Sequence, residues 1–213
     1  WRLTILLERG LVDPEDVDDF DMLPDMPDDL TSQERAQLLV YEAVEQIDHD
    51  RDEALRTAEQ VLEIDPNCID ALLCLAHIEH LSGGDPLPFR QRALEAANAR
   101  LERGVPHYRF GIDDLWPMSP ANRCIVRAHG ATALSLWDHD DHEGAMGLAE
   151  RTIALNPRDN MGIRWHLVNW YLIDQSSGKA YKLLRRYPDE PVAPSVFAGA
   201  LIEFLRSGPG KKA

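Results

Sequence analysis

Three residues with metal-ligating side chains follow one another at a spacing of three in a segment that we expect to be helical. Cys74, His77 and His80 would spread over about a third of the helix circumference, because successive residues are rotated by about 100°. A structural zinc site needs four ligands, and no fourth candidate lies nearby in the sequence. We therefore predict no metal site here, and the two histidines stay as candidates for contact with a partner.

Other patterns that could support chemistry are incomplete. The segment 138–142, Asp-His-Asp-Asp-His, is dense in ligand types but falls in an expected turn, where polar residues cap the following helix. His142-Glu143 lacks the second histidine of a zinc protease, because position 146 is Met. Gly210-Lys211 is followed by Lys212 where a phosphate-binding loop needs Ser or Thr. We predict a protein that is not an enzyme and uses no cofactor.

The charge balance restricts the class of partner. The 213 residues include 37 acidic and 22 basic side chains, for a formal net charge of −15. Binding to nucleic acid or to an anionic membrane draws on Lys and Arg, so we expect neither partner. Nine acidic and no basic residues lie between Asp13 and Asp29; this run is either a solvated linker or a contact surface for a basic partner. Three cysteines without paired spacing favour reduced thiols and a cytoplasmic protein.

Two segments of the chain share one pattern in the same register. Ala54 and Ala58 correspond to Ala145 and Ala149, and each alanine is displaced by 91 positions, as are the prolines that follow at 66 and 157. Alanines at i and i+4 lie on one helical face and allow a neighbouring helix to approach closely. The proline then ends the helix. This pattern is typical of the second helix of a tetratricopeptide repeat, whose period of about 34 residues predicts an irregular unit between the two copies.

Start and stop signals along the chain predict an all-α fold. Short helices are expected at 1–9 and 13–20, and no alternating strand pattern of useful length is present. The remaining helices are expected at 31–48, 51–64, 68–81, 87–103, 119–137, 141–155, 160–174, 178–186 and 194–206. We therefore expect an acidic N-terminal segment over 1–30, a tetratricopeptide-type solenoid of antiparallel helix pairs over 31–206, and a flexible tail over 207–213.

Three stretches carry a resemblance to a known family. The segments 156–164, 186–190 and 116–123, the last with Pro120, resemble a group of uncharacterised bacterial tetratricopeptide proteins distantly similar to the suppressor-of-tumorigenicity-seven proteins. The resemblance covers about 35–206. It implies helical repeats and a role in protein interaction, and it implies no biochemical activity.

In such a solenoid the first helix of each pair lines a concave groove that holds extended peptides or helices. Registering the repeats by their prolines places six candidate contacts there: His77, His80, Arg127, Trp137, Arg164 and Tyr171. Arg, Trp and Tyr dominate binding hot spots. The Lys and Asn of the chaperone carboxylate clamp are absent, so we expect no binding of chaperone tails. Two alternatives stay open: Arg164 bridges to Asp159 instead, and Trp165 and Trp170 belong to the core.

These observations favour a non-catalytic scaffold that binds a protein or peptide segment in its groove. The alternative is an accessory repeat domain of a longer protein whose activity lies upstream of residue 1. The sequence indicates neither the identity of the partner nor the oligomeric state.

Overall fold

The computed structural model describes residues 6, 9, 11, 24–118, 120–188 and 193–208. Every regular element among these residues is a helix, which confirms the all-α prediction. Most residues of the expected helices at 1–9 and 13–20 and of the expected tail lie outside the described residues. The elements are α2 (Ser32–Gln46), α3 (Arg51–Ile64), α4 (Ile69–Leu81), α5 (Leu87–Glu102), α6 (Leu115–Met118), η3 (Pro120–Asn122), α7 (Arg123–Asp138), α8 (His142–Leu155), α9 (Ile163–Ile173), α10 (Ser177–Leu184) and α11 (Ala193–Ser207).

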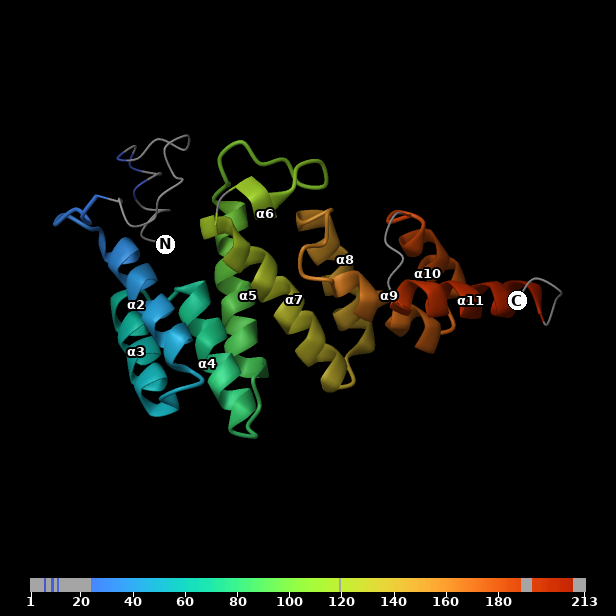
Figure 1. Cartoon of the computed structure of the whole chain (residues 1–213), viewed down its shortest axis with the longest axis horizontal. Coiled ribbons are helices and arrows are strands. Elements are labelled where there is room, and N and C mark those ends of the chain that lie inside the picture. The colour runs from blue at the N-terminus through green and yellow to red at the C-terminus, as the bar shows by residue number, and fades with distance from the viewer. Residues whose placement is uncertain are drawn as a thin grey trace.

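The helices pack as consecutive antiparallel pairs. The pairs α2/α3, α4/α5, α7/α8 and α9/α10 follow one another along the longest axis of the molecule, and α11 packs on α9 and α10 at the C-terminal end (Figure 1). Among the first helices of the pairs, α2 contacts α4 and α4 contacts α7. The second helix of each pair also contacts the first helix of the next pair. This arrangement is a helical solenoid of the tetratricopeptide type.

The helix ends follow from local side-chain chemistry. Thr31 and Glu34 form the expected capping box at the start of α2. Asp50 accepts a hydrogen bond from the Glu53 N–H at the start of α3, and Asp141 accepts one from the Gly144 N–H at the start of α8. The two repeat copies therefore begin with the same cap, and each ends within two residues of its proline.

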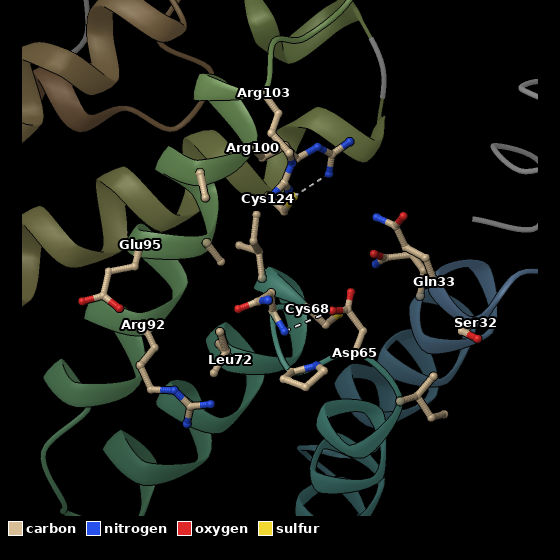
Figure 2. A pocket seen from close by; sticks show the side chains of 17 residues that line it. Ser32, Gln33, Asp65, Cys68, Leu72, Arg92, Glu95, Arg100, Arg103 and Cys124 are labelled. Atoms are coloured by element: carbon tan, nitrogen blue, oxygen red, sulfur yellow. Dashed lines mark hydrogen bonds between the residues drawn. The ribbon is translucent and has the colours of Figure 1, made fainter.

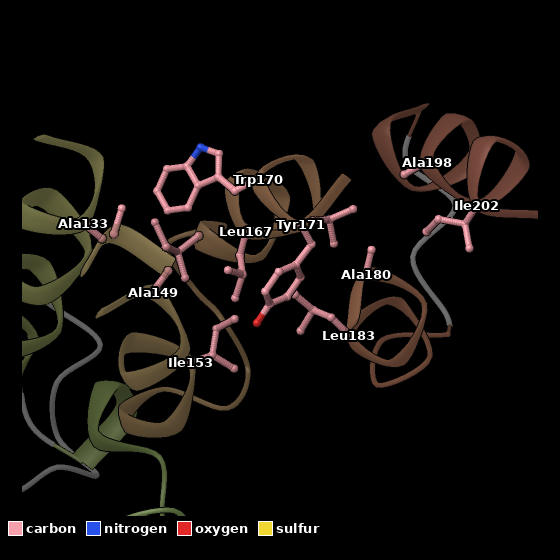
Figure 3. Close-up of a cluster of buried hydrophobic side chains, with 13 residues drawn as sticks. Ala133, Ala149, Ile153, Leu167, Trp170, Tyr171, Ala180, Leu183, Ala198 and Ile202 are labelled. Carbon is pink, nitrogen blue, oxygen red and sulfur yellow. The ribbon is translucent and has the colours of Figure 1, made fainter. Parts of the chain in front are cut away.

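The small alanines have the role that the repeat predicted. Ala54, Ala58, Ala145 and Ala149 are all fully buried, so both copies occupy like environments between packed helices. Figure 3 shows the C-terminal core, where Ala149 faces bulky side chains such as Leu167 from neighbouring helices. A fully buried Leu stabilises the fold by about 1.5–3 kcal/mol, and the small partner residue lets the helices approach closely enough to bury it.

The irregular unit is the segment between α5 and α7. It contains α6 and the 3-10 helix η3, so α7 begins at Arg123 and not at the expected 119. Leu115 is fully buried and anchors the segment. Asp114 accepts a hydrogen bond of 2.7 Å from the side chain of Asn156 at the end of α8. The insertion is therefore fastened to the following pair, α7/α8. Its extra residues explain why the displacement of 91 between the two repeat copies is not a multiple of one period.

Candidate partner-binding groove

A groove lies between the first helices of the first two pairs and reaches α7. Its cavity volume is about 240 Å³. Apolar side chains from α2 and α4 form most of its surface, and Val44 at its edge is 48% exposed. The polar side chains lie around them. The lining consists of Val40, Tyr41, Val44, Ile47, Asp70, Leu73, Cys74, His77 and Arg127; we call it the α2–α4 groove.

One buried carboxylate connects the three helices around the groove. Asp70 of α4 is 8% exposed, and it accepts hydrogen bonds from the Arg127 guanidinium of α7 at 2.6 Å and from the Gln37 amide of α2 at 3.0 Å. Burial opposes the charge on Arg127, but the facing Asp70 carboxylate outweighs it, so the pKa of Arg127 is raised. This pair fixes the spacing of α2, α4 and α7 and leaves the groove without net charge.

The thiol and the phenol that line the groove both hold their protons at neutral pH. Burial raises the pKa of the Cys74 thiol to about 12, so it is protonated at neutral pH and unreactive. Burial also raises the pKa of Tyr41, and the Asp70 charge adds to the effect. Within the ranges that the structure describes, no three His, Cys, Asp or Glu side chains are arranged to hold a metal ion.

The structure separates the six predicted contact residues. His77 is exposed and lines the α2–α4 groove together with Arg127. His80 lies elsewhere, in a hollow of about 360 Å³ beside the turn between α4 and α5. Trp137 is half-buried and stacks on Trp170, with ring centroids 4.6 Å apart. Only His77 and Arg127 of the six therefore belong to one site.

Arg164 and Tyr171 are largely buried and lie outside the α2–α4 groove. Arg164 is 5% exposed and donates to Asp159 at 2.7 Å, which was the alternative interpretation of this residue. Its guanidinium also lies 4.7 Å from the ring centroid of Tyr187. Tyr171 is 5% exposed and its hydroxyl bonds to Glu150. Both side chains fasten α9 to neighbouring segments, and Tyr171 also lines a cavity between α8, α9 and α10.

The three stretches that carried the family resemblance meet in the same internal network. Tyr187 donates to the Pro157 carbonyl at 2.9 Å. Asn156 donates to Asp114 and to Asn160, and Asp114 also accepts a hydrogen bond from the Trp116 N–H at 3.1 Å. Trp170 is buried, as the core alternative for it expected. These residues hold the irregular unit and the last pair together, so their types are explained by packing.

The sequence interpretation missed a larger cavity. It has a volume of about 670 Å³ and lies between the start of α2, the turn from α3 to α4, and one face of α5 (Figure 2). Arg92 and Arg100 of α5 line it, as does Arg103, which directly follows α5; we call it the α5 cavity. Their spacing of eight and three places them on one helical face, a signal that is present in the sequence.

The three cysteines are free and buried. No helix in the described ranges is both long and apolar enough to cross a membrane.

No protein-family model matches the chain, and no curated protein matches it. Several solved structures are similar to it, among them the following two. The first is pilF of Pseudomonas aeruginosa, with a TM-score of 0.39, 14% identity, and coverage of 83% of this chain and 86% of that one. The second is YrrB, titled a TPR protein with an unusual peptide-binding site, with a TM-score of 0.34, 14% identity, and coverage of 79% and 90%. Similarities at this level assign no function to the chain.

Proposed function

We propose that residues 31–206 form a non-catalytic module that binds a segment of a partner protein in the α2–α4 groove. The observation that carries this proposal is an open groove lined mainly by apolar side chains. The charged residues in its lining, Asp70 and Arg127, neutralise each other. Val44 is 48% exposed, and Leu73 lies beside it in the lining. An apolar side chain of the partner would cover both and gain their burial.

The polar side chains at the groove define what a partner segment would meet there. His77 is exposed and offers a hydrogen-bonding ring to the backbone of a bound segment. The Arg127 side chain is 35% exposed and its charge is compensated by Asp70. The groove therefore favours a segment with apolar anchors over a strongly charged one. Such anchors carry most of the binding energy in protein interfaces.

A peptide selection tests the proposal. A displayed library of random peptides is panned on the full chain, and selected peptides are measured by titration calorimetry. We expect Val44→Glu to weaken binding about tenfold or more, because it places a charge against the apolar anchor. Ile173→Glu is the matched control, because Ile173 is 64% exposed and lies at the end of α9, away from the groove. Peptides that bind both variants equally would refute the groove as the site.

A further inference from the structure

Two further cavities each lie against the second helix of a pair. The α5 cavity is bounded by the end of α3, the start of α4 and the face of α5. A second cavity of about 340 Å³ is bounded by α8, α9 and α10; we call it the α10 cavity. The α5 cavity also reaches the start of α2, whereas the α10 cavity lies against the C-terminal half of α8. What the two cavities share is one side formed by the second helix of a pair, α5 in one and α10 in the other.

Both openings have basic side chains on the corresponding helix. Arg92 and Arg100 come from α5, and Arg103 directly follows it. Lys179, Lys182 and Arg186 come from α10 or directly follow it. The two cavities are lined by six basic and three acidic side chains, although acidic residues outnumber basic ones by 37 to 22 in the whole chain. The charge of this surface is therefore opposite to that of the molecule.

Part of this positive charge is uncompensated. Arg92 and Arg103 are exposed, and so are Lys182 and Arg186; within the described parts of the chain, no acidic group lies at ion-pair distance from any of the four. Arg100 is held in place, because it donates to the Ala121 carbonyl at 3.2 Å and to the Asn122 side chain at 3.3 Å. An anionic group entering the α5 cavity would meet one fixed and two extended guanidinium groups.

The floors of both cavities are apolar. Ile69 and Leu72 line the α5 cavity, and Ile153 and Leu167 line the α10 cavity. A ligand with both carboxylates and apolar side chains matches this combination, since guanidinium groups bind carboxylates through paired hydrogen bonds. A polyphosphate backbone matches it less well, because it carries no apolar side chains to cover Ile69, Leu72, Ile153 and Leu167.

We infer that this surface, formed by the α5 and α10 cavities, binds an acidic segment of a partner protein that also carries apolar residues. It differs from the proposed groove. On α4 the two sites use different but adjoining faces, because Ile69 and Leu72 line the α5 cavity whereas Leu73 and His77 line the α2–α4 groove.

Fluorescence anisotropy with the full chain tests this inference. The probe is a fluorescein-labelled peptide of repeated Glu-Glu-Leu units, and a Lys-Lys-Leu peptide is the charge-reversed comparison. We expect saturable binding of the acidic peptide at low salt and a loss of about fivefold to tenfold for Arg103→Glu and for Arg186→Glu. Arg51→Glu is the matched control, because it makes the same charge change at an exposed site on α3 outside both cavities.

Each other outcome decides against the surface. An equal loss for Arg51→Glu would show that net charge alone governs binding. Tighter binding of a single-stranded oligonucleotide, with the same dependence on Arg103 and Arg186, would assign the surface to nucleic acid. No saturable binding at low salt would also overturn the inference. Val44→Glu should leave the acidic peptide unaffected, so failure here is distinguishable from failure of the groove.

Discussion

At the scale of single residues, His129 of α7 shows how burial controls ionisation in this fold. Its side chain is fully buried, and Nδ1 lies 2.8 Å from the Ile125 carbonyl oxygen. A carbonyl only accepts, so Nδ1 carries the proton, and Nε2 accepts from Arg151 Nε at 3.4 Å. Burial lowers the pKa of His129 to about 4, although the bond to Ile125 acts in the opposite direction. The folded state therefore holds a neutral ring.

This predicts a loss of stability in mild acid. The unfolded chain takes up a proton near the ordinary pKa of 6.5, whereas the folded chain does so only near 4. The contribution is thus complete above 6.5 and declines as pH falls toward 4. We expect the free energy of unfolding to drop by about 2 kcal/mol between about pH 7.5 and pH 5, measured by urea denaturation.

His129→Phe, which cannot titrate, provides the comparison for that measurement. It should show a much flatter profile over the same interval, whatever its absolute stability. His139 stays in both proteins; its pKa is raised, mainly by its bond to the Ser135 carbonyl, so its effect has the opposite sign. Equal slopes for the wild type and His129→Phe would contradict the assignment.

Local residue contacts were predictable from the sequence, and distant ones were not. The Arg164–Asp159 pair spans five positions, and the short turn before α9 brings the two side chains together. The Asp70–Arg127 pair spans 57 positions and depends on how α4 and α7 align across an insertion of irregular length. Nothing in local spacing determines that alignment. Arg127 was therefore predicted as a groove residue without its partner Asp70.

At the scale of the elements, boundaries were predicted closely wherever a cap or a proline sets them. The helix expected at 51–64 is observed at Arg51–Ile64, between the Asp50 cap and Pro66. The start of α7 was placed four residues early, because Ser119-Pro120 resembles a helix start while the chain first makes the 3-10 turn η3. Capping signals locate a turn of helix but do not distinguish a 3-10 turn from an α-helix.

The equivalent alanines predict equal responses to added volume. Ala58→Leu and Ala149→Leu each place a large side chain where no space is exposed, so we expect each to cost about 2 kcal/mol of unfolding free energy. Gly147→Ala is the opposing control within α8. An added Cβ at Gly147 meets no heavy atom within 4 Å, and we expect a gain of about 0.5–1 kcal/mol.

Chemical denaturation of the three variants measures these changes. A neutral Ala58→Leu beside a destabilising Ala149→Leu would show that the two repeat copies are packed differently.

At the scale of the whole molecule, the sequence indicated the class of fold but not its surfaces. Amphipathic periodicity and the repeated alanines require paired helices to stack, and the broken period required an irregular unit. The α5 and α10 cavities instead lie between helices of different pairs. Their shapes depend on how those pairs pack against one another. Residues on one helix face were recognisable as neighbours, but the element opposite them was not.

The charge distribution of the whole molecule leads to a last prediction. A net charge of −15 produces self-repulsion that destabilises the compact state. Exposed surface ion pairs, such as Arg56 with Glu53, contribute little to stability. Added salt shortens the Debye length to about 10 Å at 0.1 M and screens the repulsion. We therefore expect the melting temperature to rise by a few degrees between low salt and about 0.15 M NaCl, measured by circular dichroism.

Tetramethylammonium chloride should have the same effect, because its cation screens equally but is too bulky to be coordinated by carboxylates. A rise in NaCl alone would point to bound sodium, and a fall in both salts would mean that attractive ion pairs outweigh the repulsion. Binding of the acidic peptide to the α5 and α10 cavities should weaken over the same range, because that attraction is screened as well.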